Sequence, residues 1–113
     1  MNTWVLISIF GISGTLVRAG AVTYFGDYAP WATLIVNVLG CFIIGNIQAS
    51  ELSLDWKTIL GIGFLGALTT FSGFAMFVIK WFEIKNYQMA GIYFFATNFA
   101  CLAACYAGYK FKF

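Results

Sequence analysis

The sequence contains no histidine, only one proline, and charged side chains at just 9% of its 113 positions. Without histidine, and without a recognisable pairing of a nucleophile with a base, the chain offers little for enzymatic catalysis. A soluble domain carries many more charges, since roughly 25% of residues are charged in an average globular chain. Because 62% of the residues are hydrophobic instead, we expect most of the surface to face lipid.

The few charges and the cysteines exclude further classes of protein. The net charge of +2 is small and scattered, and no run of basic residues exists to bind nucleic acid. Cys41, Cys101 and Cys105 are odd in number, lie in apolar stretches and form no CxxC pair. Neither a disulfide framework nor a zinc site is therefore expected. We interpret all three as small packing residues of helices.

Four apolar stretches predict an all-α membrane protein with four transmembrane helices, because each is about 20 residues long. They form a single domain over residues 1–113, with spans at about 3–24, 31–48, 58–82 and 87–109. The first stretch lacks a basic leader and runs past the roughly 7–15 apolar residues of a secretory signal, so we expect it to be retained as a span. Tryptophan and tyrosine cluster near the span ends, as in an interfacial aromatic belt.

The lysines give the chain almost no preferred orientation in a membrane. Four spans place both termini and the 49–57 loop on one side, with Lys57, Lys110 and Lys112, while Lys80 and Lys85 lie on the other. Such a balance predicts no firm topology under the positive-inside rule. Copies inserted in opposite directions could then pair as an antiparallel dimer.

Arg18 and Asn37 lie within the first two predicted spans, where polar groups are costly. Arg18 either draws an anion into a water-filled vestibule, or it snorkels to the interface or caps a helix end. Asn37 either lines a pore with its amide donors or bonds a neighbouring helix. The span cores contain no Asp or Glu, one of which a proton-coupled exporter normally needs.

The third predicted span is interrupted by glycines and by a polar block around Thr69. A break there would expose backbone carbonyls, which are tolerated at membrane depth where they coordinate an ion or line a cavity. The candidates are the carbonyls of Gly66 and Thr69, which suit a hard cation such as Na+; a flexible packing helix is the alternative. Phe71 and Phe74 share one helix face. Their positive ring edges can contact an anion, unless both rings simply face lipid.

In the fourth predicted span, polar side chains recur at every fourth residue, at Tyr93, Thr97 and Cys101, with Asn98 beside them. This stripe either lines an ion path or bonds neighbouring helices. By themselves, the residues indicate at most a small-anion pore with a carbonyl-bound cation.

Over essentially its whole length the chain resembles the Fluc/CrcB family of fluoride channels. Three motifs in order carry the resemblance: Gly11-x-x-Gly14-Thr15-x-x-Arg18, Thr33-Leu-Ile-Val-Asn37-Val-Leu-Gly40-Cys-Phe42-x-x-Gly45, and Gly63-Phe-Leu-Gly66-Ala-Leu-Thr69-Thr70-Phe71-Ser72-Gly73-Phe74. The first motif alone is weak, but the ordered trio on a four-span chain of this length is specific.

The resemblance implies a dual-topology homodimer in the cell (inner) membrane, with two antiparallel pores through which cytoplasmic fluoride leaves passively. Such export would confer fluoride resistance. The resemblance also implies a structural Na+ at the dimer interface that is not transported, bound by the carbonyls of Gly66 and Thr69 from each subunit. The residues that would line the fluoride pore are Phe71, Phe74, Asn37, Tyr93, Thr97 and Cys101.

Two departures from the family pattern concern the ion path. Gly73 stands where the family usually has Thr, and Cys101 where it usually has Ser. They leave open a heterodimer in which a second chain completes or replaces one pore. The alternative function is therefore a non-conducting assembly subunit whose polar groups serve as helix contacts. A small multidrug-type exporter is less favoured, because such a transporter relies on a Glu in its first span that this chain lacks.

Overall fold

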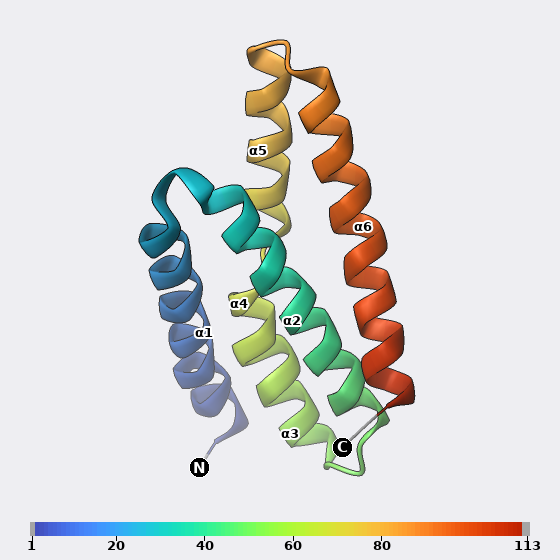
Figure 1. The fold of residues 1–113 in the computed structure, drawn as a ribbon. Helices are drawn as coiled ribbons and strands as arrows, with labels where there is room; N and C mark the ends of the chain where they lie inside the picture. Colours follow the sequence, from blue (N-terminus) through green and yellow to red (C-terminus); the bar gives the residue numbers. More distant parts are fainter. Residues whose placement is uncertain (1, 112–113) are drawn as a thin grey trace.

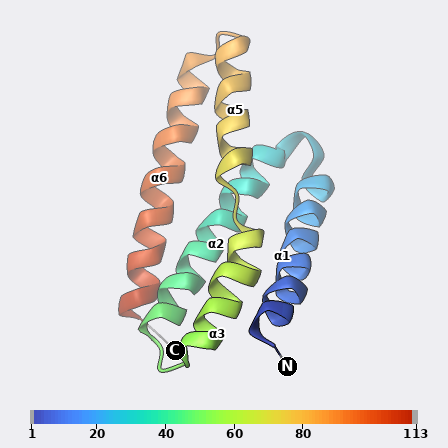
Figure 2. The ribbon, with the colours of Figure 1, turned by 180° about the vertical axis from the view of Figure 1, so that it is seen from behind.

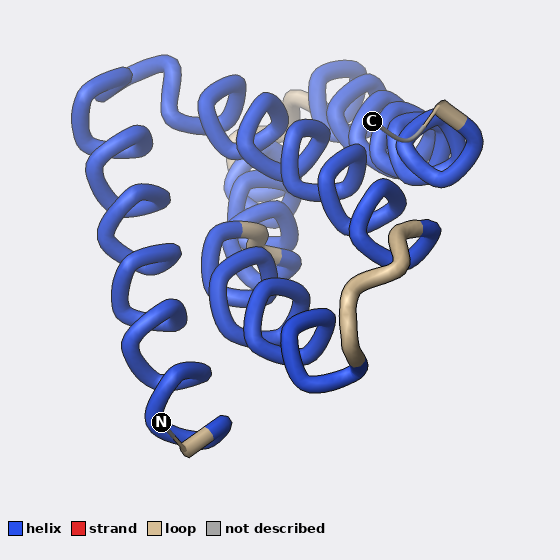
Figure 3. The backbone as a smooth tube through the Cα atoms, turned by 90° about the horizontal axis from the view of Figure 1, so that it is seen from below, coloured by secondary structure: helices blue, strands red, loops and turns tan. Residues whose placement is uncertain are grey.

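The computed structural model describes residues 2–111, and within them every regular element is a helix. The all-α prediction is therefore confirmed. The elements are α1 (Thr3–Phe25), a 3-10 turn η1 (Gly26–Tyr28), α2 (Ala29–Ala49), α3 (Leu54–Thr58), a π-helix η2 (Ile59–Leu65), α4 (Gly66–Leu68), α5 (Phe71–Glu83) and α6 (Tyr87–Lys110). Non-helical backbone is confined to short connections (Figure 3). Lys112, counted above among the lysines of one side, lies outside the described residues.

Polar side chains fix where several of these helices begin. The Asn2 side chain accepts a hydrogen bond from the Trp4 N–H at the start of α1, and Ser53 does the same for Trp56 at the start of α3. Each cap satisfies an N–H group that lacks a partner inside the helix. The Ser53 cap explains why the helix begins at Leu54, several residues before the apolar stretch that we predicted from about residue 58.

Three segments of the described chain are long and apolar enough to cross a membrane: Thr3–Ala49, Leu54–Glu83 and Tyr87–Lys110. The first contains both α1 and α2, and the chain reverses direction between them at η1 (Figure 1). The beginning of α1, the 50–53 loop and the end of α6 lie at one end of the bundle, and the α5–α6 connection lies at the other (Figures 1 and 2).

Helices α2 and α6 form the most extensive contact in the molecule. They approach closely because each contributes a glycine: a side chain at Gly45 would collide with the Cys105 carbonyl, and one at Gly108 with the Phe42 carbonyl. Asn46 strengthens the pair, since its side-chain N–H group donates to the Gly108 carbonyl at 3.2 Å. This close packing of small residues is typical of helices that associate within lipid.

The π-helix η2 was not predicted from the sequence. Its wider turns direct the Gly66 N–H to the Gly61 carbonyl rather than to the usual partner one turn back. η2 packs against α1, where Gly14 lies so close to the Phe64 carbonyl that no side chain fits between them. This contact positions the residues that follow η2, which are those of the candidate site.

Candidate functional site

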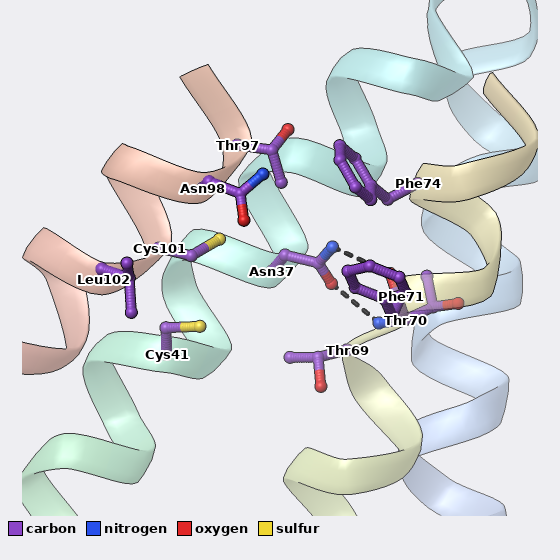
Figure 4. A pocket seen from close by; sticks show the side chains of 10 residues that line it. All are labelled: Asn37, Cys41, Thr69, Thr70, Phe71, Phe74, Thr97, Asn98, Cys101 and Leu102. Atoms are coloured by element: carbon purple, nitrogen blue, oxygen red, sulfur yellow. Dashed lines mark hydrogen bonds between the residues drawn. The ribbon is translucent and has the colours of Figure 1, made fainter. Parts of the chain in front are cut away.

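Thr69 and Thr70 leave the helical conformation between α4 and α5, with ψ angles of 154° and 120°. Asn37, on the neighbouring helix α2, pairs with the backbone of Thr70 at this point. The Thr70 N–H donates to the Asn37 side-chain oxygen at 2.8 Å, and the Asn37 side-chain N–H donates to the Thr70 carbonyl at 3.0 Å. Figure 4 shows both bonds as dashed lines. Asn37 therefore replaces hydrogen bonds that a continuous helix would have made.

The carbonyls of Gly66 and Thr69, which are the predicted cation ligands, lack their usual helical partners in this structure. In a continuous α-helix the Thr70 N–H would bond to the Gly66 carbonyl and the Gly73 N–H to the Thr69 carbonyl. Here the Thr70 N–H is directed to Asn37, and the Gly73 N–H donates to the hydroxyl of Thr70 at 3.0 Å. Gly66 and Thr69 thus lose their helical partners as a result of two side chains, Asn37 and Thr70.

Gly66 and Thr69 also line one cavity of about 210 Å³, together with Gly40, Cys41, Ile44, Gly61 and Leu65. Its lining contains no carboxylate and no basic group. Carbonyl oxygens of unwound backbone are among the ligands that hard cations such as Na+ accept. The residues present therefore fit a monovalent cation bound by oxygen atoms at this position, with Gly66 and Thr69 as the candidate ligands.

Arg18 caps the end of α4. Its Nε–H donates to the Ala67 carbonyl at 2.9 Å, which is another carbonyl released where the helix ends. Of the alternatives that we considered, this bond matches the capping role, since a basic group near a helix C-terminus stabilises its carbonyls. Arg18 is not among the residues that line either cavity described in this subsection.

A second cavity, of about 250 Å³, lies between α2, α5 and α6 beside the non-helical residues (Figure 4). It brings together five of the six residues that we predicted for the fluoride pore. Its lining consists of Asn37, Cys41, Thr69, Thr70, Phe71, Phe74, Thr97, Asn98, Cys101 and Leu102. None of these side chains carries a formal charge, so the cavity offers dipoles and ring edges rather than ion pairs.

The two phenylalanines have different surroundings although they lie on the same helix face. Their ring centroids are 5.2 Å apart with the planes tilted by 58°. Phe74 is only 3% exposed and packs against Tyr93 and Phe94, whereas Phe71 is 75% exposed on the single chain. Phe74 is thus held in place by other rings, while most of the Phe71 ring is exposed at the surface of the single chain.

Tyr93 lies next to the cavity but does not line it. Its side chain is completely buried among the rings of Trp31, Phe74, Phe77 and Trp81. Its hydroxyl donates to the Pro30 carbonyl at 2.7 Å, which joins α6 to the beginning of α2. In this structure the Tyr93 hydroxyl serves as a helix contact, the alternative that we left open for the polar stripe.

Thr97 differs from Tyr93 in the hydrogen bonding of its hydroxyl. Its hydroxyl oxygen is buried at the cavity and has no hydrogen-bond partner within the described chain. A buried polar atom without a partner costs roughly 1–3 kcal/mol, so this hydroxyl invites a functional explanation. The adjacent Asn98 also lines the cavity, but its side-chain N–H group donates within α6, to the Phe94 carbonyl at 2.8 Å.

Sequence reasoning missed two residues of the site. Thr70 determines which carbonyls lack a helical partner. A threonine immediately before a helix commonly caps it, and this pattern could have identified Thr70 as the N-cap of α5. Cys41 lines both cavities, and its position four residues after Asn37 on the same helix was the signal for it.

The family described as CrcB-like protein, Camphor Resistance (CrcB), matches residues 5–109. A curated relative from Acidithiobacillus ferrooxidans is 35% identical, covering 94% of this chain and 92% of the relative. Relatives from Geobacter sulfurreducens and Shewanella oneidensis are 36% and 33% identical and cover 96% and 100% of this chain, and 94% and 98% of their own lengths. All three carry the name fluoride-specific ion channel FluC.

Proposed function

The chain belongs to this CrcB-like family, and on that basis we propose that it is a passive, fluoride-selective channel that exports cytoplasmic fluoride. The observation that carries the proposal most directly is the cavity lined by phenylalanine rings and uncharged donors beside the end of α4. A channel of this kind transforms no substrate, so the chain is not an enzyme.

The chemistry of the cavity suits a small anion that must shed water and still move on. Positive ring edges of Phe71 and Phe74 attract an anion without the tight hold of a charged group. The Thr97 hydroxyl, which has no partner, and the Cys101 thiol supply neutral donors along α6. Asn37 contributes a side-chain amide whose orientation is fixed by Thr70. Tyr93 supports the wall from behind by holding Phe74.

We propose four membrane spans and an antiparallel homodimer with two pores. The exposed apolar surface is extensive, and Phe71 is largely exposed although it lines the cavity. A second copy seated against this side would cover Phe71 and close the path. The balanced lysines on the two ends of the bundle are compatible with copies that insert in opposite directions.

We further propose that the carbonyls of Gly66 and Thr69 bind a structural Na+ between the two copies. The diversion of the Thr70 and Gly73 N–H groups supports this assignment, because it leaves both oxygens without their helical partners. A cation there would offset the cost of unpaired carbonyls in a low-dielectric setting. The ion would hold the two copies together and would not be transported.

Export through such a pore needs no energy source if the protein lies in the cell (inner) membrane. An inside-negative potential of 100 mV is worth about 2.3 kcal/mol for each anion that leaves. Rejection of chloride is then essential, because a chloride leak would dissipate the same potential.

A second candidate function is a non-conducting assembly subunit that pairs with a different chain. The observation in its favour is that the polar groups of Asn37 and Tyr93 are engaged in bonds between helices of one chain. A multidrug-type exporter has no such support, since the cavity contains no carboxylate to exchange protons.

Fluoride efflux from liposomes that contain only this protein tests the proposal. With a K+ ionophore present to remove the charge limit, we expect rapid fluoride release and no chloride release. Phe71→Ile and Phe74→Ile should each slow the release, whereas Phe99→Ile, an exposed ring on α6 outside the cavity lining, should not. Absence of release by the wild-type protein alone would favour the assembly subunit.

A further inference from the structure

Two cysteine side chains line the cavity of about 250 Å³ between α2, α5 and α6. Cys41 projects from α2 and Cys101 from α6, and both line this cavity (Figure 4). The two thiols lie close enough to influence each other electrostatically. Their proximity follows from the close approach of α2 and α6 at Gly45 and Gly108. The proposed pore function uses the Cys101 thiol as one weak donor and leaves the pairing itself unexplained.

The surroundings indicate which ligand a pair of thiols could take. Within residues 2–111, no group of three or more His, Cys, Asp or Glu side chains is arranged to hold a metal ion. Cys105 lines a different cavity, which lies nearer the C-terminal end of α6. The site therefore lacks the three or four ligands that zinc requires. Two sulfur ligands suit a soft cation that accepts linear coordination.

Charge selects among the soft cations. Binding converts two thiols to two thiolates, because the thiolate is the metal ligand. A divalent ion such as Hg2+ then forms a neutral S–Hg–S bridge, in which two sulfur–metal bonds replace two S–H bonds and both protons pass to water. A monovalent ion would leave one net negative charge in an uncharged, apolar wall, where isolated charges are strongly disfavoured.

We propose that Cys41 and Cys101 form a two-thiol site for a soft, divalent, linearly coordinating cation, and that an ion bound there obstructs the cavity. The first part concerns the chain alone. The second part rests on the proposed channel function, because obstruction has meaning only if the cavity conducts an anion. The site would make the protein sensitive to thiophilic metals.

Mass measurement of the intact chain in detergent tests the site without reference to conduction. After treatment with one equivalent of mercuric acetate, we expect the wild-type chain to carry a single mercuric ion and to have lost two protons. Cys41 and Cys101 should then resist alkylation by a maleimide, while Cys105 should still react. Cys105→Ser should retain the bridge, whereas Cys41→Ser and Cys101→Ser should both lose it.

A bridge that persists in Cys41→Ser, or that disappears in Cys105→Ser, would overturn the proposal, because the ion would then connect Cys101 with Cys105 along α6. A stable disulfide between Cys41 and Cys101 in protein purified without oxidant would also overturn it, since no thiols would be free to bind.

Liposome efflux then tests obstruction, with each variant compared with itself before and after mercury. We expect the efflux of wild-type and Cys105→Ser protein to fall to the leak of empty vesicles, and that of Cys41→Ser to be unaffected by mercury. A bridge detected by mass with unchanged efflux would overturn the obstruction but not the site. Absence of efflux before mercury is added would count against the channel function, while the mass result would still decide the site.

Discussion

The Asn37 side chain and the Thr70 backbone hold each other through two hydrogen bonds, in which each residue donates once and accepts once. A side chain of α2 thereby takes the place of a helical turn between α4 and α5. The same pairing withdraws the Thr70 N–H from the Gly66 carbonyl, so that one residue both supports the non-helical segment and leaves that carbonyl without its helical partner.

Asn37→Ala should destabilise the protein, because it leaves the Thr70 N–H and carbonyl without partners in a partly buried setting. We expect the free energy of unfolding to fall by about 1–3 kcal/mol, measured by denaturation in detergent. Asn98→Ala is the matched control, since Asn98 bonds only within its own helix and should change stability much less. Equal effects of the two substitutions would contradict the role assigned to the Asn37–Thr70 pair.

Thr70→Val should affect both helix stability and the response to Na+. The hydroxyl caps α5 by accepting from the Gly73 N–H, and loss of such a cap costs about 1 kcal/mol. The released N–H can then return to the Thr69 carbonyl and compete with the proposed ion. We expect thermal unfolding in Na+ and in N-methylglucamine to differ less for Thr70→Val than for the wild type. Thr70→Ser retains the hydroxyl and should behave like the wild type; an unaltered Na+ effect in Thr70→Val would refute the competition.

Gly45→Ala and Gly108→Ala should separate α2 from α6, because each added methyl group would meet a backbone carbonyl of the other helix. We expect a loss of about 1–3 kcal/mol or more in detergent unfolding experiments, as for other overpacked contacts. Gly91→Ala is the control on α6: the space beside Gly91 is open, and alanine favours the helix by up to about 1 kcal/mol. The contact is not as tight as described if Gly45→Ala matches Gly91→Ala.

Thr97→Val should separate stability from conduction. The hydroxyl of Thr97 is buried without a partner, so its replacement by a methyl group should leave the free energy of unfolding unchanged or raise it by about 1 kcal/mol. The proposed fluoride efflux should nevertheless slow, because a donor beside the path is lost. Lower stability with normal efflux would show instead that the hydroxyl is bonded in the assembled protein.

Tyr93→Phe should have the reverse outcome. The hydroxyl bonds the Pro30 carbonyl, so its removal should lower the free energy of unfolding by about 1 kcal/mol. Efflux should be retained, since the ring that supports Phe74 remains. Loss of efflux at unchanged stability would place the Tyr93 hydroxyl on the ion path, as the sequence analysis predicted.

The sequence indicated the approximate positions of the long helices but not the π-helix η2. Hydropathy over some 20 residues is a strong signal, and the predicted ends agree with α1 and α6 to within one residue. The Gly- and Thr-rich block marked the place where Thr69 and Thr70 become extended. These features are local, so neighbouring residues carry the information.

Contacts between distant residues were the part that could not be read from the sequence. Asn37 and Thr70 are 33 positions apart, and Arg18 and Ala67 are 49 apart; which atoms meet depends on how the helices pack. The residues of the α6 stripe differ in their surroundings for a related reason. Successive steps of four residues turn about 400° each in an α-helix, so Cys101 is rotated by roughly 80° from Tyr93. That rotation lets Tyr93 pack among the rings of α5 and bond Pro30 at the beginning of α2, while Cys101 lines the cavity farther along α2 with Cys41.

The number of residues in the π-helix η2 determines the orientation of the helices that follow it. Each residue of an α-helix turns the chain by about 100°, and the wide turns of η2 accommodate additional residues without a new loop. An extra residue gained or lost within Ile59–Leu65 would therefore act mainly as a rotation of everything that follows, and would turn Gly66 away from the cavity that it lines. The number of residues in this segment sets the orientation of the end of α4. We therefore expect changes in its length to be rarer in evolution than changes in its side chains.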